Sequence, residues 1–111
     1  MTTDSPVDEL AGEVFDVENL LDYQTGAVVS RTLVDREAGS VTVFSFDEGE
    51  RLSEHTAPHD ALLQALDGTA AVTVAGEEYE LHAGESLVLP ADEPHAVEAV
   101  ERFKMLLTMM N

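Results

Sequence analysis

Residues 69–100 read TAAVTVAGEEYELHAGESLVLPADEPHAVEAV, and this stretch decides the fold class. It consists of short apolar runs separated by the turn-forming pairs Ala75-Gly76 and Ala83-Gly84 and by the segment from Pro90 to Pro94. Runs of four to eight residues bounded by glycine and proline are typical of strands joined by tight turns. The stretch therefore predicts strands at residues 69–74, 78–82, 86–89 and 95–100.

The same pattern continues on both sides of this stretch. Strand-like runs precede it at residues 27–34, 41–46 and 61–66, and another follows at 103–110. In the run VTVFSF, Phe44 and Phe46 alternate with Val43 and Ser45, so the two pairs face opposite ways. Many short strands with frequent turns predict an all-β sandwich or barrel, and the 111 residues suffice for one domain.

The N-terminal part of the chain has a different pattern. Residues 15–23 (FDVENLLDY) predict one or two helical turns, with Asp16 as the N-cap. Residues 1–13 are polar and acidic, which predicts a flexible leader ahead of a single domain at 14–111.

The charge and composition exclude several classes of function. Asp and Glu number 23 against 5 Lys and Arg, giving a formal net charge of −18, which disfavours nucleic acids and anionic membranes as partners. The absence of cysteine excludes disulfides, thiolate metal sites and cysteine nucleophiles. The N-terminus lacks the pattern of a secretion signal, and no apolar run is long enough to cross a bilayer, so we expect a cytoplasmic protein.

Histidines carry the remaining chemistry. Three of the four, His55, His59 and His95, lie near predicted turns, whereas His82 falls on the polar side of a predicted strand. Imidazole is a common metal ligand and the side chain that titrates near neutral pH. No Gly-x-Ser-x-Gly motif is present, so a hydrolase triad has no support.

The spacing around these histidines resembles the small single-domain cupins of the cupin 2 conserved-barrel type. Gly49, His55 and Gly68 match the first cupin motif, G-x₅-H-x-H-x₃₋₄-E-x₆-G. Gly84, Pro90 and His95 match the second, G-x₅-P-x-G-x₂-H-x₃-N. Together the two motifs span residues 49–99, and the flanking strands extend the likeness to nearly the whole domain.

The resemblance implies a cupin jelly-roll barrel (a double-stranded β-helix), here with a short N-terminal helical turn. It also implies one divalent metal ion held inside the barrel by motif His and Glu residues. The imidazoles of His55 and His95 are then expected to converge on one point. Metal-dependent enzymes and non-enzymatic binders both occur in this family, so the fold does not settle the function.

The departures from the motifs concern the ligands themselves. Ala57 stands where the second His of the first motif belongs, and Ala61 stands at the Glu position. In the second motif Asp92 replaces the Gly before the histidine, and Ala99 replaces the final Asn. Only two of the four expected ligands remain, so two cavity histidines without a metal are an open alternative.

His59 is the candidate replacement ligand. It shares parity with His55 in an extended segment, although Pro58 between them could break that parity. Gln64 is a weaker candidate oxygen ligand, and Asp60 either orients a ligating histidine or caps a turn. A site at His55, His59 and His95 suits a divalent transition metal such as Zn, Fe, Mn, Ni or Cu.

Three functions therefore stay open. The first is a metal-dependent enzyme acting on a small polar metabolite, and the second is a non-catalytic cupin that binds a metal or small ligand as a sensor. The third is a structural or interaction barrel with an empty pocket.

The run at 103–110 also suggests a homodimer. One face carries Phe103, Met105, Leu107 and Met109, and the other is still apolar at Leu106 and Met110. A second copy of the chain would cover that second face, or the N-terminal turn would fold over it and leave a monomer.

The acidic composition predicts a salt-loving protein, and an ordinary acidic cytosolic protein is the open alternative. Screening weakens the repulsion among carboxylates, so the melting temperature should rise as NaCl goes from tens of millimolar to molar. Thermal melts across this range test it, and a flat or falling melting temperature would contradict the prediction.

Overall fold

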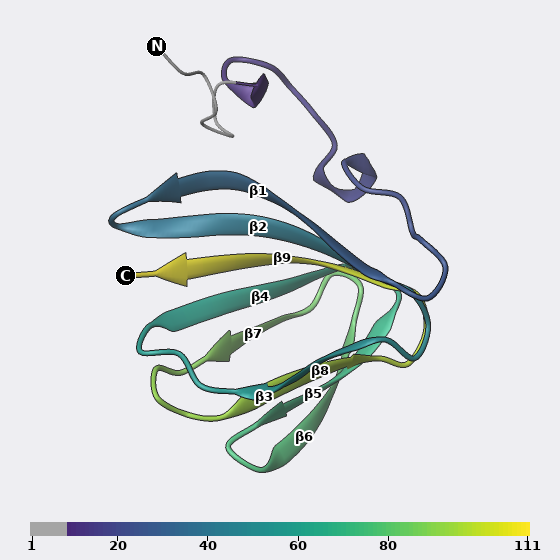
Figure 1. Cartoon of the computed structure of the whole chain (residues 1–111), viewed down its shortest axis with the longest axis vertical. Coiled ribbons are helices and arrows are strands. Elements are labelled where there is room, and N and C mark those ends of the chain that lie inside the picture. Colours follow the sequence, from purple (N-terminus) through teal and green to yellow (C-terminus); the bar gives the residue numbers. More distant parts are fainter. Residues whose placement is uncertain (1–8) are drawn as a thin grey trace.

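The computed structural model describes residues 9–111, in which nine strands follow a mostly irregular N-terminal segment (Figure 1). The 3₁₀ turn η1 spans Val17–Asn19. The strands are β1 Val28–Arg36, β2 Gly39–Phe46, β3 Arg51–His55, β4 Asp60–Asp67, β5 Thr69–Val74, β6 Glu77–His82, β7 Ser86–Leu89, β8 His95–Ala99 and β9 Phe103–Met110.

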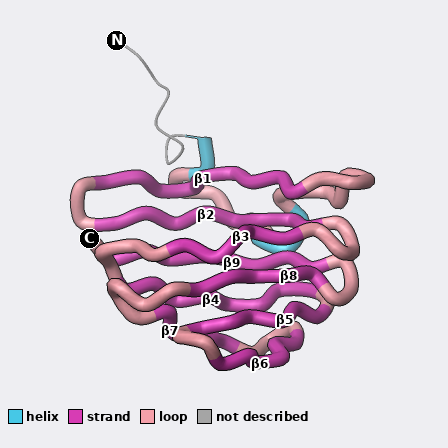
Figure 2. The backbone as a smooth tube through the Cα atoms, turned by 60° about the horizontal axis from the view of Figure 1, so that its bottom comes forward, coloured by secondary structure: helices cyan, strands magenta, loops and turns pink. Residues whose placement is uncertain are grey.

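The strands form two antiparallel sheets that face each other (Figure 2). Sheet A has the order β1-β2-β9-β4-β7, and sheet B has the order β3-β8-β5-β6. From β4 to β9 the chain passes back and forth between the sheets, as expected of a jelly roll. The predicted fold class is thus confirmed, including the short N-terminal helical turn with Asp16 as its N-cap.

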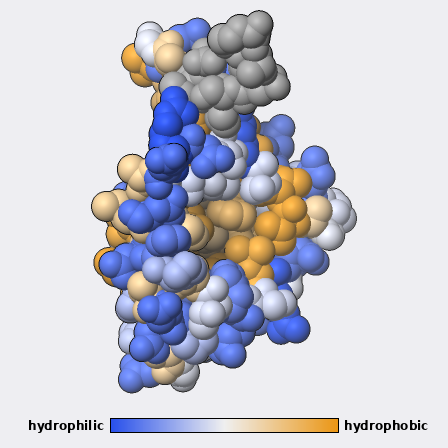
Figure 3. Space-filling view, turned by 60° about the vertical axis from the view of Figure 1, so that its left-hand side comes forward, coloured by the Kyte–Doolittle hydropathy of each residue, from blue (hydrophilic) through white to orange (hydrophobic). Residues whose placement is uncertain are grey.

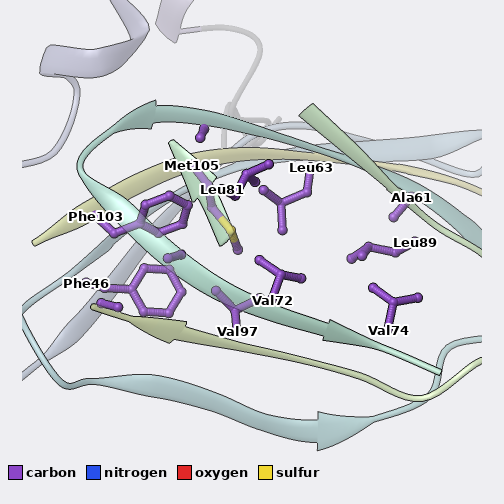
Figure 4. Close-up of a cluster of buried hydrophobic side chains, with 13 residues drawn as sticks. Phe46, Ala61, Leu63, Val72, Val74, Leu81, Leu89, Val97, Phe103 and Met105 are labelled. Carbon is purple, nitrogen blue, oxygen red and sulfur yellow. The ribbon is translucent and has the colours of Figure 1, made fainter. Parts of the chain in front are cut away.

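The core lies between the sheets and follows from the period-two alternation. In β4, Ala61, Leu63 and Ala65 are buried and the residues between them are not. Figure 4 shows side chains from both sheets pointing toward one another, and the largest fully buried ones are Phe46, Phe103, Leu63, Met105 and Val72. A one-residue slip of any such strand would turn its apolar set outward, so the alternation fixes the register.

Strand β3 was not among the predicted strands. Its sequence, RLSEH, has no β-branched residue, and four of its five residues are exposed. It is held by backbone pairing with β8, in which Arg51 lies opposite Glu98 and Leu52 opposite Val97. This strand therefore forms because it pairs with β8, and not because its own residues favour a strand.

The N-terminal segment packs against the outer face of sheet A around Lys104. This residue is only 7% exposed, and its ammonium donates to the Glu18 carbonyl at 2.8 Å. The Tyr23 ring lies 4.8 Å from the same ammonium, and the Tyr23 hydroxyl donates to Asp67. Burial, together with the Asp67 carboxylate, raises the pKa of Tyr23. The intramolecular cover considered from the sequence thus exists over this part of the sheet.

The predicted flexible leader falls mainly on residues 1–8, which lie outside the described residues. Glu9 and Leu10 are helical, and the Glu9 carboxylate lies 3.9 Å from the Arg31 guanidinium. Within residues 9–111 no helix is long and apolar enough to span a membrane.

Gly68 leaves less room for a side chain than any other glycine of the chain. Its φ is +76°, and a Cβ placed there would lie 1.7 Å from the Arg102 carbonyl oxygen. Gly49 has a similar φ of +83° but no heavy atom within 4 Å of such a Cβ. An alanine at Gly49 would therefore introduce backbone strain alone, whereas an alanine at Gly68 would introduce both strain and a steric clash.

We expect Gly68→Ala to lower the free energy of unfolding by at least about 3 kcal/mol, because strain and clash act together. Gly49→Ala should cost only roughly 1–2 kcal/mol, the price of a left-handed alanine. Urea denaturation of both variants measures the difference. Equal losses would contradict the close approach at Gly68.

Candidate functional site

His55 and His95 meet at one end of the barrel although forty residues separate them. They are cross-strand partners, His55 at the end of β3 and His95 at the start of β8. Their Nε2 atoms lie 3.1 Å apart, and the ring centroids lie 4.4 Å apart with the ring planes at 70°. The convergence expected from the motif register is therefore observed.

The backbone sets the tautomer of each ring. Nδ1 of His55 lies 2.7 Å from the Ser53 carbonyl oxygen, and Nδ1 of His95 lies 3.3 Å from the Glu93 carbonyl oxygen. A carbonyl oxygen only accepts, so each Nδ1 must carry the proton in these bonds. Both neutral rings then direct an Nε2 lone pair at the other, which is favourable only when a cation lies between them. A shared proton or a metal ion satisfies that requirement.

Burial distinguishes the two rings. His95 is 7% exposed, whereas His55 is exposed. Burial lowers the pKa of His95 below its usual value, and the positive charge of a protonated His55 lowers it further. His95 is thus biased toward the neutral imidazole, the form that binds metals.

The loop before His95 is held in place from outside the pair. The backbone N–H of Ala91 donates to Asp60 Oδ1 at 2.8 Å, and the N–H of Asp92 donates to the Ala57 carbonyl at 2.8 Å. Asp92 takes the place of the motif glycine and keeps a positive φ of 67°, which aspartate tolerates better than most residues. Asp60 was expected either to orient a ligating histidine or to cap a turn, and the structure shows a hydrogen bond to the turn.

The other candidate residues lie apart from this pair or lack a shown contact with it. His59 is half-buried in the loop between β3 and β4. Gln64 pairs across the sheet with Leu106 and lies on the outer face of sheet A, as its parity indicated. Within residues 9–111, no three His, Cys, Asp or Glu residues form a cluster that could hold a metal ion. Ligation by His59 therefore stays a prediction.

The donor set fits part of a transition-metal site. Two nitrogens 3.1 Å apart can both bond to one ion, because metal–nitrogen bonds are about 2.0–2.1 Å long for Zn²⁺. Both Nδ1 atoms already have the carbonyl partners that metal-binding histidines commonly use. Two protein ligands leave the remaining coordination positions to water or a small molecule.

The surroundings of the pair are apolar. Val74 is the cross-strand neighbour of His95 on β5, and Ala61 and Leu89 are buried on the facing sheet. Figure 3 views the side on which β9 ends and shows apolar side chains around a hollow in the surface. The carboxylate of Asp60 accepts a hydrogen bond from the Ala91 N–H.

The sequence did not reveal the two carbonyl groups of the site. Ser53 and Glu93 each stand two residues before their histidine, so both rings bond to the backbone in the same i−2 relation. Every residue has a carbonyl, so composition carries no signal for this role. Only the local backbone path shows it.

The lowered pKa of His95 predicts a pH dependence for the metal-free protein. Below about pH 6.5 the unfolded chain takes up a proton on His95, whereas burial keeps the folded ring neutral. Protonation therefore favours unfolding, so the free energy of unfolding is highest above that pH and decreases as the pH falls. Urea denaturation of wild type and His95→Gln from pH 8 to pH 5 tests it. On acidification the free energy of unfolding of the wild type should fall more than that of His95→Gln. An equal fall in both proteins would contradict the lowered pKa of His95.

Comparisons with known proteins agree with this geometry. The cupin domain family matches residues 42–110. A conserved protein of unknown function from Streptococcus pyogenes is 38% identical, with a TM-score of 0.86 over 90% of this chain and 88% of that one. A cupin superfamily protein from Desulfitobacterium hafniense is 28% identical, with a TM-score of 0.85 over 89% and 91%.

A third similar structure is longer than this chain. The cupin 2 conserved barrel domain protein from Leptotrichia buccalis is 44% identical, with a TM-score of 0.85 over 87% of this chain but only 47% of its own. No curated protein matches the sequence. The family match covers more than half of the chain and agrees with the jelly roll and the paired histidines, so the protein belongs to the cupin family.

Proposed function

We propose that this cupin binds one divalent transition metal ion through Nε2 of His55 and Nε2 of His95. The observation that carries the proposal is the 3.1 Å separation of the two Nε2 atoms, with a carbonyl oxygen beside each Nδ1 atom. A neutral hydrogen bond between the rings would need one Nδ1 to give up its proton and its carbonyl bond. A metal ion needs neither change.

The residues around the pair would hold the two rings in the form that binds a metal ion. The Ser53 and Glu93 carbonyls hold the protons away from Nε2, and burial keeps His95 neutral. The contacts of Asp60 and Ala57 hold the loop that carries Glu93. A bound ion would supply a Lewis acid with open positions for a small molecule.

Ligand binding without turnover is the function that these residues support best. Ala57 and Ala61 replace two ligands of the motif and supply neither a donor nor a general base. A small polar ligand would therefore be held by the ion and by the apolar walls around it. This arrangement suits a sensor or carrier.

A metal-dependent enzyme acting on a small polar metabolite is the second candidate. It is favoured by the number of open positions, because two protein ligands leave room for two reactants on one ion. Turnover assays on small acids, sugars and phenols, with and without Fe²⁺ or Mn²⁺, distinguish it from the sensor.

Metal titration of protein made without a His tag tests the proposal. Calorimetry with Zn²⁺, Ni²⁺ and Fe²⁺ should show one site per chain, and His55→Ala or His95→Ala should weaken it by 10-fold or more, since each removes one of two protein ligands. His82→Ala is the matched control, because His82 is exposed and bonds to Thr69 and Glu80 instead.

His59→Ala tests the third ligand. A loss of affinity comparable to that of His55→Ala would make His59 a ligand, and an unchanged affinity would leave the site with two. A wild-type protein that binds none of the three ions would contradict the metal proposal and leave a proton-sharing histidine pair.

A further inference from the structure

Strand β3 turns His55 toward the barrel against the alternation of its own side chains. Leu52 packs against the core, and its cross-strand partner Val97 is buried. In a regular strand the residues that share a face are two positions apart, so counting from Leu52 places Glu54 on the inner face and His55 on the outer one. Yet the His55 ring contacts the ring of the buried His95. The strand must therefore be irregular between Leu52 and His55.

The pairing with β8 locates this irregularity. The register shifts between Leu52 and His55, and in this interval β3 has two residues, Ser53 and Glu54, where β8 has only Ala96. Two residues of one strand opposite a single residue of its partner form a β-bulge. We call Ser53 and Glu54 the β3 bulge. Its extra residue reverses the alternation, and the next side chain, that of His55, faces inward.

The outer surface of sheet B agrees with this geometry. A hollow of about 300 Å³ lies there, and its lining includes Ser53, Glu54, Ala96 and Thr73. Thr73 alternates with buried residues of β5 and is the cross-strand partner of Ala96, so the hollow is on the outer face. Both bulge residues are exposed and line it together. They therefore point to the same side, which neighbours in a regular strand do not.

The β3 bulge determines which side chain faces His95. Without it, regular pairing of β3 with β8 would place Glu54 opposite His95 and turn His55 outward. The candidate site would then offer one carboxylate and one imidazole. With the bulge it offers two imidazoles, which suit Zn²⁺, Ni²⁺ and Cu²⁺ better than the oxygen-preferring ions Mg²⁺ and Ca²⁺. One extra residue in the backbone thus sets the chemistry of the donor pair.

We propose that the β3 bulge is the positioning element of the candidate site, because it holds His55, and not Glu54, opposite His95. The Ser53 carbonyl, 2.7 Å from Nδ1 of His55, belongs to the bulge, so the same irregularity turns the ring inward and orients it. Bulges beside functional sites often redirect a side chain in this way. The consequence for metal choice rests on the proposed function, whereas the position of the two rings does not.

An exchange of neighbouring residues tests the positioning role. The double variant Glu54→His with His55→Glu keeps the composition, and a fixed bulge turns the introduced imidazole outward. In the metal-free wild type, ring centroids 4.4 Å apart should give a nuclear Overhauser effect between the two rings, and the exchange should abolish it. Its Ni²⁺ affinity should fall by 10-fold or more, because one of the two imidazoles is lost.

The bulge itself offers the matched control. The exchange Ser53→Glu with Glu54→Ser also swaps two neighbours, but both positions point outward. It should keep the ring-to-ring Overhauser effect and leave the Ni²⁺ affinity within about 3-fold of the wild type, since the backbone and both imidazoles are unchanged.

A deletion tests the extra residue. Without Glu54, one residue separates Leu52 from His55, so regular alternation turns both inward and the Overhauser effect should persist. Deletion of Ser53 leaves the same count and serves if the first variant does not fold, and thermal melts establish which variants are folded.

Two results would overturn the proposal. One is a folded deletion variant that lacks the Overhauser effect, and the other is an exchange variant whose imidazole at position 54 contacts His95. A wild type that shows the effect but binds no Ni²⁺, Zn²⁺ or Fe²⁺ would instead contradict the metal proposal and support the positioning role alone.

Discussion

The pairing of β8 with two neighbours joins the fold to the candidate site. This strand has β3 on one side and β5 on the other, so its register sets the positions of three strands in sheet B. Val97 and Ala99 anchor it in the core, and His95 follows the same inward parity. If β8 slipped by one residue, its apolar side chains would leave the core and the two histidines would separate.

The site is a reduced form of the family pattern in which backbone groups have a large part. Alanine occupies two of the ligand positions, yet the two remaining imidazoles are held by carbonyls in the same i−2 relation. This arrangement directs both lone pairs at one point without any charged side chain. Such a site would depend on local backbone geometry more than on a network of carboxylates.

Charge is unevenly distributed between the outer faces of the two sheets. Glu78, Glu80 and Glu98 lie on the outer face of sheet B, whereas the outward residues of β9 include no carboxylate. Lys104, the single lysine of the chain, is buried under the N-terminal segment. Its ammonium group donates to a backbone carbonyl and lies over an aromatic ring. The segment thus covers the sheet around Lys104 and Ser45 and leaves Val88 and Met110 exposed.

From the sequence by itself, period-two alternation predicted an all-β fold and most of the strands, and the resemblance of the motif spacing to cupins implied the jelly roll and the convergence of His55 with His95. It did not reveal β3, whose residues have little strand preference and which exists through pairing with β8. Nor did it decide whether Asp60 contacts a histidine or a turn, or which part of sheet A the N-terminal segment covers. These features depend on which groups from distant parts of the chain come within hydrogen-bonding distance, and only the tertiary structure decides that.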